Sequence, residues 1–107
     1  MDVQILQQGR ILEEKPAEEI FKIMSNKQAM DILQATAEAP KSAWEISTMC
    51  GIPLTQAYRW IHRLHKSGLV SISGDTNSSG RRFFMYQSKI NSIKVLLNTD
   101  EPVIEIS

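Results

Sequence analysis

The stretch SAWEISTMCGIPLTQAYRWIHRLHKSGLV, residues 42–70, decides the fold of this 107-residue chain. It contains two helical patterns, separated by Gly51-Ile52-Pro53. Ser42 and Glu45 have the spacing of a capping box, in which each side chain accepts the other residue's backbone N–H, so a short helix is expected to begin here. The glycine suits the left-handed backbone conformation that ends a helix without steric cost. A second, longer helix is predicted over residues 53–67.

Apolar residues recur at helical spacing in both patterns, which indicates the faces that enter a core. Trp44 and Trp60 are expected in this core, because large aromatic side chains usually serve as packing units. Cys50 is interpreted as a small buried residue and not as a redox-active thiol, which would need exposure and a low pKa. The other residues expected to point inward are Ile46, Met49, Ala57, Ile61 and Leu64.

Two more helices are predicted before this stretch. Pro16 suits a first helical position, and this helix should end near Ser25. Ser25 and Gln28 then have capping-box spacing, which predicts the start of the next helix, and Pro40 closes it. Residues 1–15 are expected to form a strand-like arm, whose apolar residues are Val3, Ile5, Leu6, Ile11 and Leu12.

After Gly68 the hydrophobic period changes to two, which is typical of strands. Residues 69–73 and 82–88 flank the Ser/Gly-rich residues 74–80, which predicts a hairpin with a long, mobile tip in which Asp75 helps to form the turn. A second hairpin is expected in the last segment, from residues 93–97 and 103–106 joined by a turn at 98–102.

The succession of helices, tight turn, longer helix and hairpin resembles a winged helix-turn-helix protein. Ser47 stands where a small residue lets two helices cross closely, and Gly51 stands at the turn glycine. Residues 51–59 and 64–70 look like archaeal regulators of the ArsR-like class, and the resemblance extends over residues 21–86. It implies an α+β winged helix-turn-helix, with three to four helices and a β-hairpin wing, in a DNA-binding transcriptional regulator. Metal-sensing members use clustered cysteines or other paired ligands, and one cysteine does not carry that role here.

Charge is sorted along a chain whose formal net charge is zero. Between Glu45 and Asp100 stand seven basic residues and one acid, which leaves a net charge of +6. Residues 1–50 carry five basic and eight acidic residues, and residues 99–107 carry three acids. A basic helix followed by a basic loop is an electrostatic footprint for phosphate backbone, so double-stranded DNA is the expected partner.

The helix over residues 53–67 is the expected recognition helix, because an α-helix fits the major groove and its N-terminal half can reach base edges. Arg59 is the candidate for a bidentate contact with guanine. Residues nearer the end of this helix are expected to meet the backbone, and the hairpin over residues 71–86 is expected on the backbone or minor groove. The predicted DNA-binding residues are Thr55, Gln56, Tyr58, Arg59, His62, Arg63, Lys66, Arg81 and Arg82.

Each alternative function requires particular residues or binding properties. A winged-helix adaptor that binds protein without DNA is the alternative, and it predicts no duplex affinity even at low salt. A ligand- or metal-responsive repressor needs a pocket or a ligand cluster. His62 and His65 lie three apart on one helix, but no third ligand stands nearby. No catalytic set has a usable spacing, so neither an enzyme nor a cofactor is expected.

The chain divides into an arm (1–15), a winged helix-turn-helix domain (16–88) and a C-terminal β-hairpin extension (89–107). The apolar residues of the two outer segments are expected to cover a partner surface in a homodimer. Alternatively, both segments complete one sheet within the protomer. No apolar run reaches the roughly 18–20 residues needed to span a bilayer, so no membrane is expected as a partner. No signal-peptide pattern is visible, and a single cysteine fits a reducing, cytoplasmic compartment.

Overall fold

The computed structural model describes residues 4–7, 10–11 and 17–107, which form four helices and six strands. The helices are α1 (Ala17–Met24), α2 (Lys27–Ala35), α3 (Ala43–Cys50) and α4 (Leu54–Lys66). The strands are β1 (Gln4–Gln7), β2 (Arg10–Ile11), β3 (Val70–Thr76), β4 (Arg82–Ser88), β5 (Ile93–Leu96) and β6 (Val103–Ile106). The predicted α+β class is confirmed.

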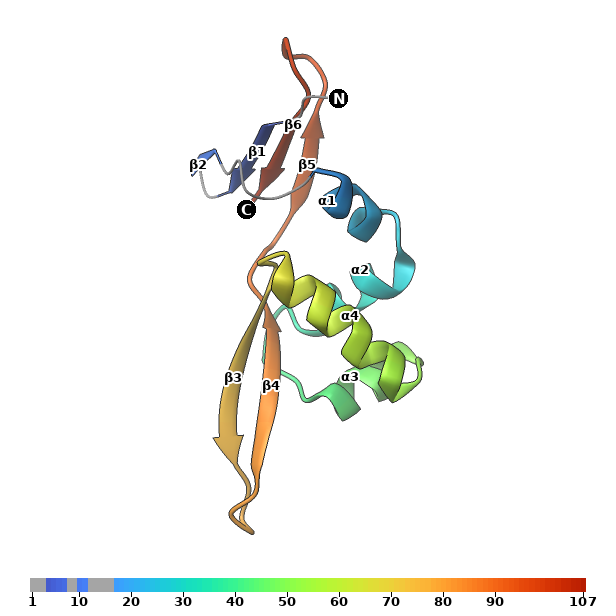
Figure 1. The fold of residues 1–107 in the computed structure, drawn as a ribbon, viewed down its shortest axis with the longest axis vertical. Helices are drawn as coiled ribbons and strands as arrows, with labels where there is room; N and C mark the ends of the chain where they lie inside the picture. Colours follow the sequence, from blue (N-terminus) through green and yellow to red (C-terminus); the bar gives the residue numbers. More distant parts are fainter. Residues whose placement is uncertain (1–3, 8–9, 12–16) are drawn as a thin grey trace.

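The strands form two separate sheets at opposite ends of the long axis, with the helices between them and to one side (Figure 1). β3 and β4 pair antiparallel and form the wing. The other sheet has the strand order β2-β1-β6-β5, and in it β1 runs parallel to β6. The Cα radius of gyration, 15.2 Å, exceeds the value of about 13 Å expected for a compact chain of this length. The excess reflects the projecting wing and sheet.

One hydrophobic core joins the four-stranded sheet to the helices. Ile5 of β1 and Ile104 and Ile106 of β6 are buried in the same cluster as Ile20 and Ile23 of α1. Ile5 pairs with Ile104 across the parallel ladder, so the two side chains share one face of the sheet. The extra C-terminal hairpin is confirmed as β5–β6. The arm and this hairpin complete one sheet within the protomer.

The residues that the structure describes in the N-terminal arm form two short strands. β1 and β2 form an antiparallel pair, with Leu6 opposite Ile11, which confirms the strand-like prediction for these segments. Val3, Leu12 and Pro16, which also entered the predictions, lie outside the described residues.

Local signals build α3 and its end as expected. Ser42 Oγ accepts the Glu45 backbone N–H at 3.1 Å, and the Glu45 carboxylate accepts the Ser42 backbone N–H at 3.1 Å, so the capping box is confirmed. Gly51 has a φ of 66° and its N–H donates to the Ser47 carbonyl, which confirms the left-handed end. α4 begins just after Pro53, close to the predicted start.

Replacing Ser42 with alanine should lower the free energy of unfolding by about 1 kcal/mol, because one N-terminal N–H of α3 loses its partner. The hydrogen bond from the Ser42 backbone N–H, and to a lesser extent the Ser42 side chain, holds the pKa of the Glu45 carboxyl below its ordinary value. A group with a depressed folded-state pKa stabilises the fold above its unfolded-state pKa, and this contribution disappears as the pH falls through the folded-state pKa. Because the titrating group of the capping box is Glu45, urea titrations from pH 7 to pH 3 should show that the deficit of Glu45→Ala shrinks with acid. An equal deficit at both ends of the range would contradict this coupling.

The cap of α2 differs from the prediction. Asn26 is the N-cap, since its Oδ1 accepts the Ala29 backbone N–H at 3.2 Å. Ser25 Oγ instead donates to the Lys22 carbonyl at 3.0 Å, at the end of α1. The predicted Ser25–Gln28 capping box is therefore wrong. Asparagine is as good an N-cap as serine, and the Gln28 side chain is engaged by α4 instead.

Two residues of α3 that were expected inside the core lie outside it. Trp44 is 67% exposed and Met49 is 58% exposed, so both predictions are wrong. α3 has only eight residues and buries Ala43 and Ile46, because a surface helix packs through one stripe and leaves the rest to solvent. Trp60 of α4 is 8% exposed, as expected for a core residue.

Candidate nucleic-acid interface

Two hydrogen bonds made by Ser47 stabilise the turn between α3 and α4. Its Oγ donates to the Ile52 carbonyl at 2.5 Å, and its own carbonyl accepts the Ile52 N–H at 3.1 Å. The small residue expected at the helix crossing therefore also makes two specific bonds across the turn. These bonds fix the direction in which α4 leaves α3.

One side of α4 packs on the other helices and the opposite side faces solvent. Ala57, Trp60, Ile61 and Leu64 are buried. At 3.6 residues per turn the positions farthest from this buried stripe form a single ridge. All four residues of the ridge are exposed, and they are Thr55, Arg59, His62 and Lys66. This outward ridge contains four of the nine predicted DNA-binding residues.

Gln56 lies on the flank of α4 that faces α2. Its Nε2 donates to Gln28 Oε1 at 2.5 Å, and Trp60 Nε1 donates to the same oxygen at 3.1 Å. Gln56 is half-buried. One of its two amide hydrogens is therefore already committed within the protein, which the sequence pattern did not indicate.

Arg63 lies on the same flank and is not a free cation. Its Nη2 and Nε donate to Glu19 Oε1 of α1 at 2.9 and 3.1 Å, and its guanidinium lies 4.5 Å from the centroid of the Trp60 ring. Arg63, one of the predicted DNA-binding residues, therefore already has a carboxylate partner within the protein. Its positive charge is partly neutralised by an acidic residue from the N-terminal half of the chain.

Tyr58 lies on the other flank of α4, towards the wing, and is 51% exposed. Burial raises the pKa of Tyr86 in β4, and Tyr58 adds to this effect.

The wing tip is a turn organised by Asn77. Its Oδ1 accepts the backbone N–H groups of Ser79 at 3.0 Å and of Arg81 at 2.9 Å. The turn is shorter than predicted, because the strands continue past the first glycine of the Ser/Gly-rich segment. Asp75 pairs with Phe83 inside the ladder, so its predicted place in the turn is wrong.

Arg81 and Arg82 are exposed where the wing tip returns into β4. Two apolar residues on the wing are exposed as well, Ile72 at 41% and Phe84 at 61%, and neither was singled out from the sequence. Both share a face with the buried Tyr86, since Ile72 is its partner in the ladder and Phe84 lies two residues before it. The wing thus carries an apolar strip beside its basic tip.

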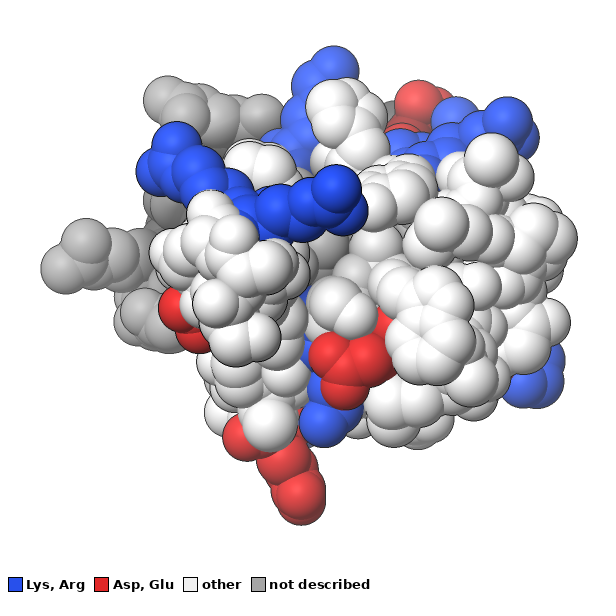
Figure 2. Space-filling model, turned by 90° about the horizontal axis from the view of Figure 1, so that it is seen from below, with Lys and Arg blue, Asp and Glu red and all other residues white. Residues whose placement is uncertain are grey.

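Apart from Arg63, the basic residues of this surface have no carboxylate partner among the residues that the structure describes. Within the described ranges, Arg59, Lys66, Arg81 and Arg82 make no ion pair. Figure 2 views the molecule from the wing end, and most of the visible Lys and Arg atoms lie in its upper half, whereas most Asp and Glu atoms lie in its lower half. On this face of the molecule basic and acidic atoms are therefore largely separated.

The part of the chain that the structure describes contains neither a candidate metal site nor a reactive thiol. No group of three or more His, Cys, Asp or Glu residues there could hold a metal ion. Cys50 is partly buried, and burial raises the pKa of its thiol, which disfavours the reactive thiolate. No described helix combines the length and apolar character needed to cross a bilayer.

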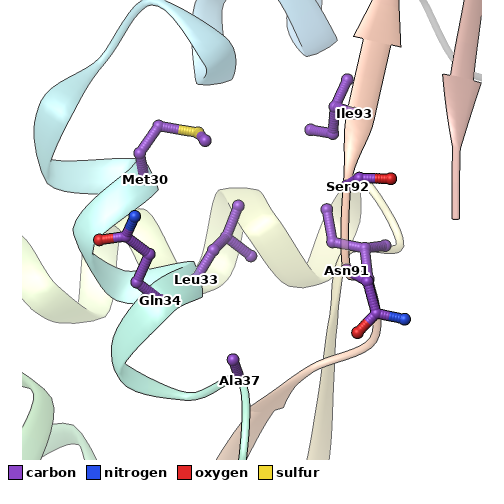
Figure 3. Close-up of a pocket in the computed structure, with 8 residues that line it drawn as sticks. Met30, Leu33, Gln34, Ala37, Asn91, Ser92 and Ile93 are labelled. Atoms are coloured by element: carbon purple, nitrogen blue, oxygen red, sulfur yellow. The ribbon is translucent and has the colours of Figure 1, made fainter.

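A hollow of about 210 Å³ separates α2 from the segment that links β4 to β5. Met30, Leu33 and Ala37 line its helix side, and residues 90–93 line the opposite side (Figure 3). Small-molecule sites are usually about 300–1,000 Å³ with a few convergent polar groups. This hollow is smaller, so it gives no support to an effector site.

Comparison with known proteins identifies the fold of this chain but not its family. No protein-family model matches the chain, and no curated protein does either. The crystal structure of NolR from Sinorhizobium fredii is similar, with a TM-score of 0.55 and 16% identity over 68% of this chain and 68% of that chain. The chain has the winged helix-turn-helix fold. At this identity the likeness extends to the fold alone, so function has to be argued from the surface of α4 and the wing.

Proposed function

We propose that this protein is a sequence-specific, double-stranded DNA-binding transcriptional regulator. α4 enters the major groove and the wing over residues 71–86 lies on the backbone or in the minor groove. The observation that supports this most is the outward ridge of α4, whose Arg59 and Lys66 have no ion-pair partner within the described ranges. Keeping cations unpaired on a helix of suitable size is what phosphate and base contacts require.

The roles within the proposed interface follow the position of each residue. Arg59 and Thr55 lie on the N-terminal part of the ridge, where they can reach base edges, and Lys66 at its far end meets phosphate. Gln56 and Tyr58 flank the ridge on its two sides. Arg63, held by Glu19, contributes less to phosphate binding than the unpaired cations do. Arg81 and Arg82 supply the wing contacts.

Duplex binding should weaken steeply with salt, and the wing arginines should carry part of that dependence. Removing one phosphate contact lowers the slope of log K against log salt by about one and weakens all sequences alike. Arg81→Ala and Arg82→Ala should each show this by fluorescence anisotropy between 50 and 300 mM salt, values chosen to bracket the usual range. Lys22→Ala, which removes an exposed cation from α1, is the matched control and should leave the slope unchanged. Equal slopes for all four proteins would remove the wing from the interface.

We further propose that the protein binds as a homodimer, so that two copies of α4 meet successive major grooves about 34 Å apart on a pseudo-palindromic site. The outer edge of β5, which pairs with no further strand in its sheet, and the adjoining Leu97, 76% exposed, are the surface we assign to this contact. Sedimentation at micromolar concentration should show a species of twice the 12.1 kDa chain mass. A single species of 12.1 kDa at every concentration would remove the dimer.

A protein-binding adaptor is the second candidate function, and the exposed side chains of α3 favour it. Trp44 and Met49 present apolar surface that duplex DNA does not need. The two functions separate at low salt, where a DNA-binding protein should show duplex affinity and an adaptor should show none. Trp44→Ala should leave duplex binding intact under the proposed function.

The finer assignments belong to the same proposal. The resemblance of residues 51–70 supports a regulator of the archaeal ArsR-like class, and the single cysteine supports a cytoplasmic location. We keep the division into an arm (1–15), a winged domain (16–88) and an extension (89–107) as a description of which segments contact DNA and which contact a second copy. No catalytic role and no cofactor is proposed.

A further inference from the structure

A chain of side-chain contacts ties the recognition helix to the helices before it. Gln28 Oε1 in α2 accepts two hydrogen bonds from residues one turn apart on α4, from Gln56 Nε2 at 2.5 Å and from Trp60 Nε1 at 3.1 Å. Trp60 is 8% exposed. Arg63 lies over its ring and is itself held by Glu19. The indole is therefore packed, stacked and hydrogen-bonded at once.

The indole N–H of Trp60 determines how the side-chain amide of Gln28 is oriented. An indole nitrogen can only donate a hydrogen bond, so the group of Gln28 that faces Trp60 has to be its carbonyl oxygen. Rotating the Gln28 amide by half a turn would bring two donors together and leave the nearly buried indole N–H unpaired, which is costly. The hydrogen-bond network thus assigns both ends of this amide.

The orientation of the Gln28 amide in turn determines the orientation of the Gln56 amide. Because Gln28 presents an oxygen, Gln56 has to approach with its amide nitrogen. The Oε1 atom of Gln56 is then the end left over, and within the described part of the chain it accepts no hydrogen bond. Gln56 is next in sequence to Thr55 of the outward ridge. Its carbonyl oxygen is accordingly the acceptor that borders the proposed base-reading surface.

We propose that Gln28 is a positioning residue that makes Gln56 select adenine at one base pair of the bound site. This inference rests on the proposed function. In the major groove adenine presents an N6 amino donor and an N7 acceptor, whereas guanine presents two acceptors. An oriented Gln56 offers its oxygen to N6 and its second N–H to N7. A freely rotating Gln56 could turn its nitrogen outward and donate to the acceptors of guanine equally well. Fixing the orientation of the amide before binding is therefore what favours adenine over guanine.

Site selection from random duplexes with purified protein tests this. Gln56→Ala identifies the base pair that Gln56 reads, because the preference there should vanish. Gln28→Lys replaces the shared acceptor with a donor, which should draw the Gln56 oxygen inward and turn its nitrogen outward. The preferred base at that position should change from adenine to one with an acceptor, with a change in relative Kd of about fivefold or more. Gln28→Glu keeps an acceptor in place and should keep adenine.

Gln34→Lys is the matched control for added charge, since Gln34 is exposed on the same helix. It should raise affinity for all duplexes without altering base preference. If Gln28→Lys still selects adenine where Gln56→Ala lost its preference, the positioning role is overturned while DNA binding stands.

Nuclear Overhauser effects in the DNA-free wild-type protein test the network without any substitution. The Trp60 indole proton should show an effect to the side-chain amide protons of Gln56, because both donors share one oxygen. Absence of this effect overturns the proposal even if Gln28→Lys does not fold. Absence of duplex binding by the wild type with the effect present would instead remove the proposed function.

Discussion

Arg59→Ala should lose sequence preference more than it loses general affinity for duplex DNA. Arg59 is exposed on the outward ridge of α4 and makes no ion pair within the described ranges, so its guanidinium is free to meet a base edge. A good bidentate pair between arginine and guanine O6 and N7 contributes about 1–3 kcal/mol of discrimination against the wrong base. Loss of this pair should relax the selected sequence at one position.

The measurement is selection of genomic fragments by the purified wild type and variant, followed by Kd values for the best site and a site changed at the relaxed position. The ratio of these Kd values should fall by about fivefold or more in Arg59→Ala. Lys66→Ala is the matched control, because it removes a cation from the same ridge at the phosphate end. It should weaken all sites alike and lower the salt slope by about one. Unchanged selected sites in Arg59→Ala would remove this residue as a reader.

Ile104→Ala should be strongly destabilising, by about 2–5 kcal/mol. Ile104 is fully buried in β6, the strand that has β1 on one side and β5 on the other. Its side chain belongs to the same core as the isoleucines of α1, so truncating it leaves a cavity between the sheet and the helices. In a domain of this size such a loss lowers the melting temperature by about 10 °C or more.

Thermal and urea unfolding at two protein concentrations would measure this effect. Leu97→Ala is the control, because Leu97 is 76% exposed beyond the end of β5 and its truncation should change the free energy by less than about 0.5 kcal/mol in the monomer. Equal melting temperatures for both variants would contradict the packing of the sheet on α1. A deficit in Leu97→Ala that appears only at high concentration would place this residue in the contact between two copies.

The helix-turn-helix could be predicted closely because its signals are local. Ser42 and Glu45 contact each other across three residues, and Gly51 needs only its own backbone freedom. The buried stripe of α4 follows from helical period alone, and Trp60 lies where that period places it. The exposed ridge with Arg59 and Lys66 follows from the same period, which is why much of the candidate site was named correctly as surface.

Predictions from the local sequence were wrong in two situations. In one, two neighbouring residues can both cap a helix; in the other, a helix is too short to show which of its apolar residues are buried. Ser25 and Asn26 are adjacent and both can cap a helix, and only the packing of α1 on α2 decides between them. In α3 the apolar residues are too many for one short helix to bury, and Trp44 and Met49 remain outside. Nothing in the periodicity of so short a segment indicates which of them contact the core.

The sequence by itself determined the winged helix-turn-helix, the basic character of its central stretch and the exposed ridge of α4, because these depend on contacts or periods of a few residues. The tertiary structure alone decided that β1 lies parallel to β6, that Glu19 holds Arg63, and that Gln28 holds Gln56 and Trp60. The partners in these contacts are between 28 and 99 positions apart in the chain. Contacts at such separations follow from how whole elements pack, and neither helical period nor capping and turn chemistry records them.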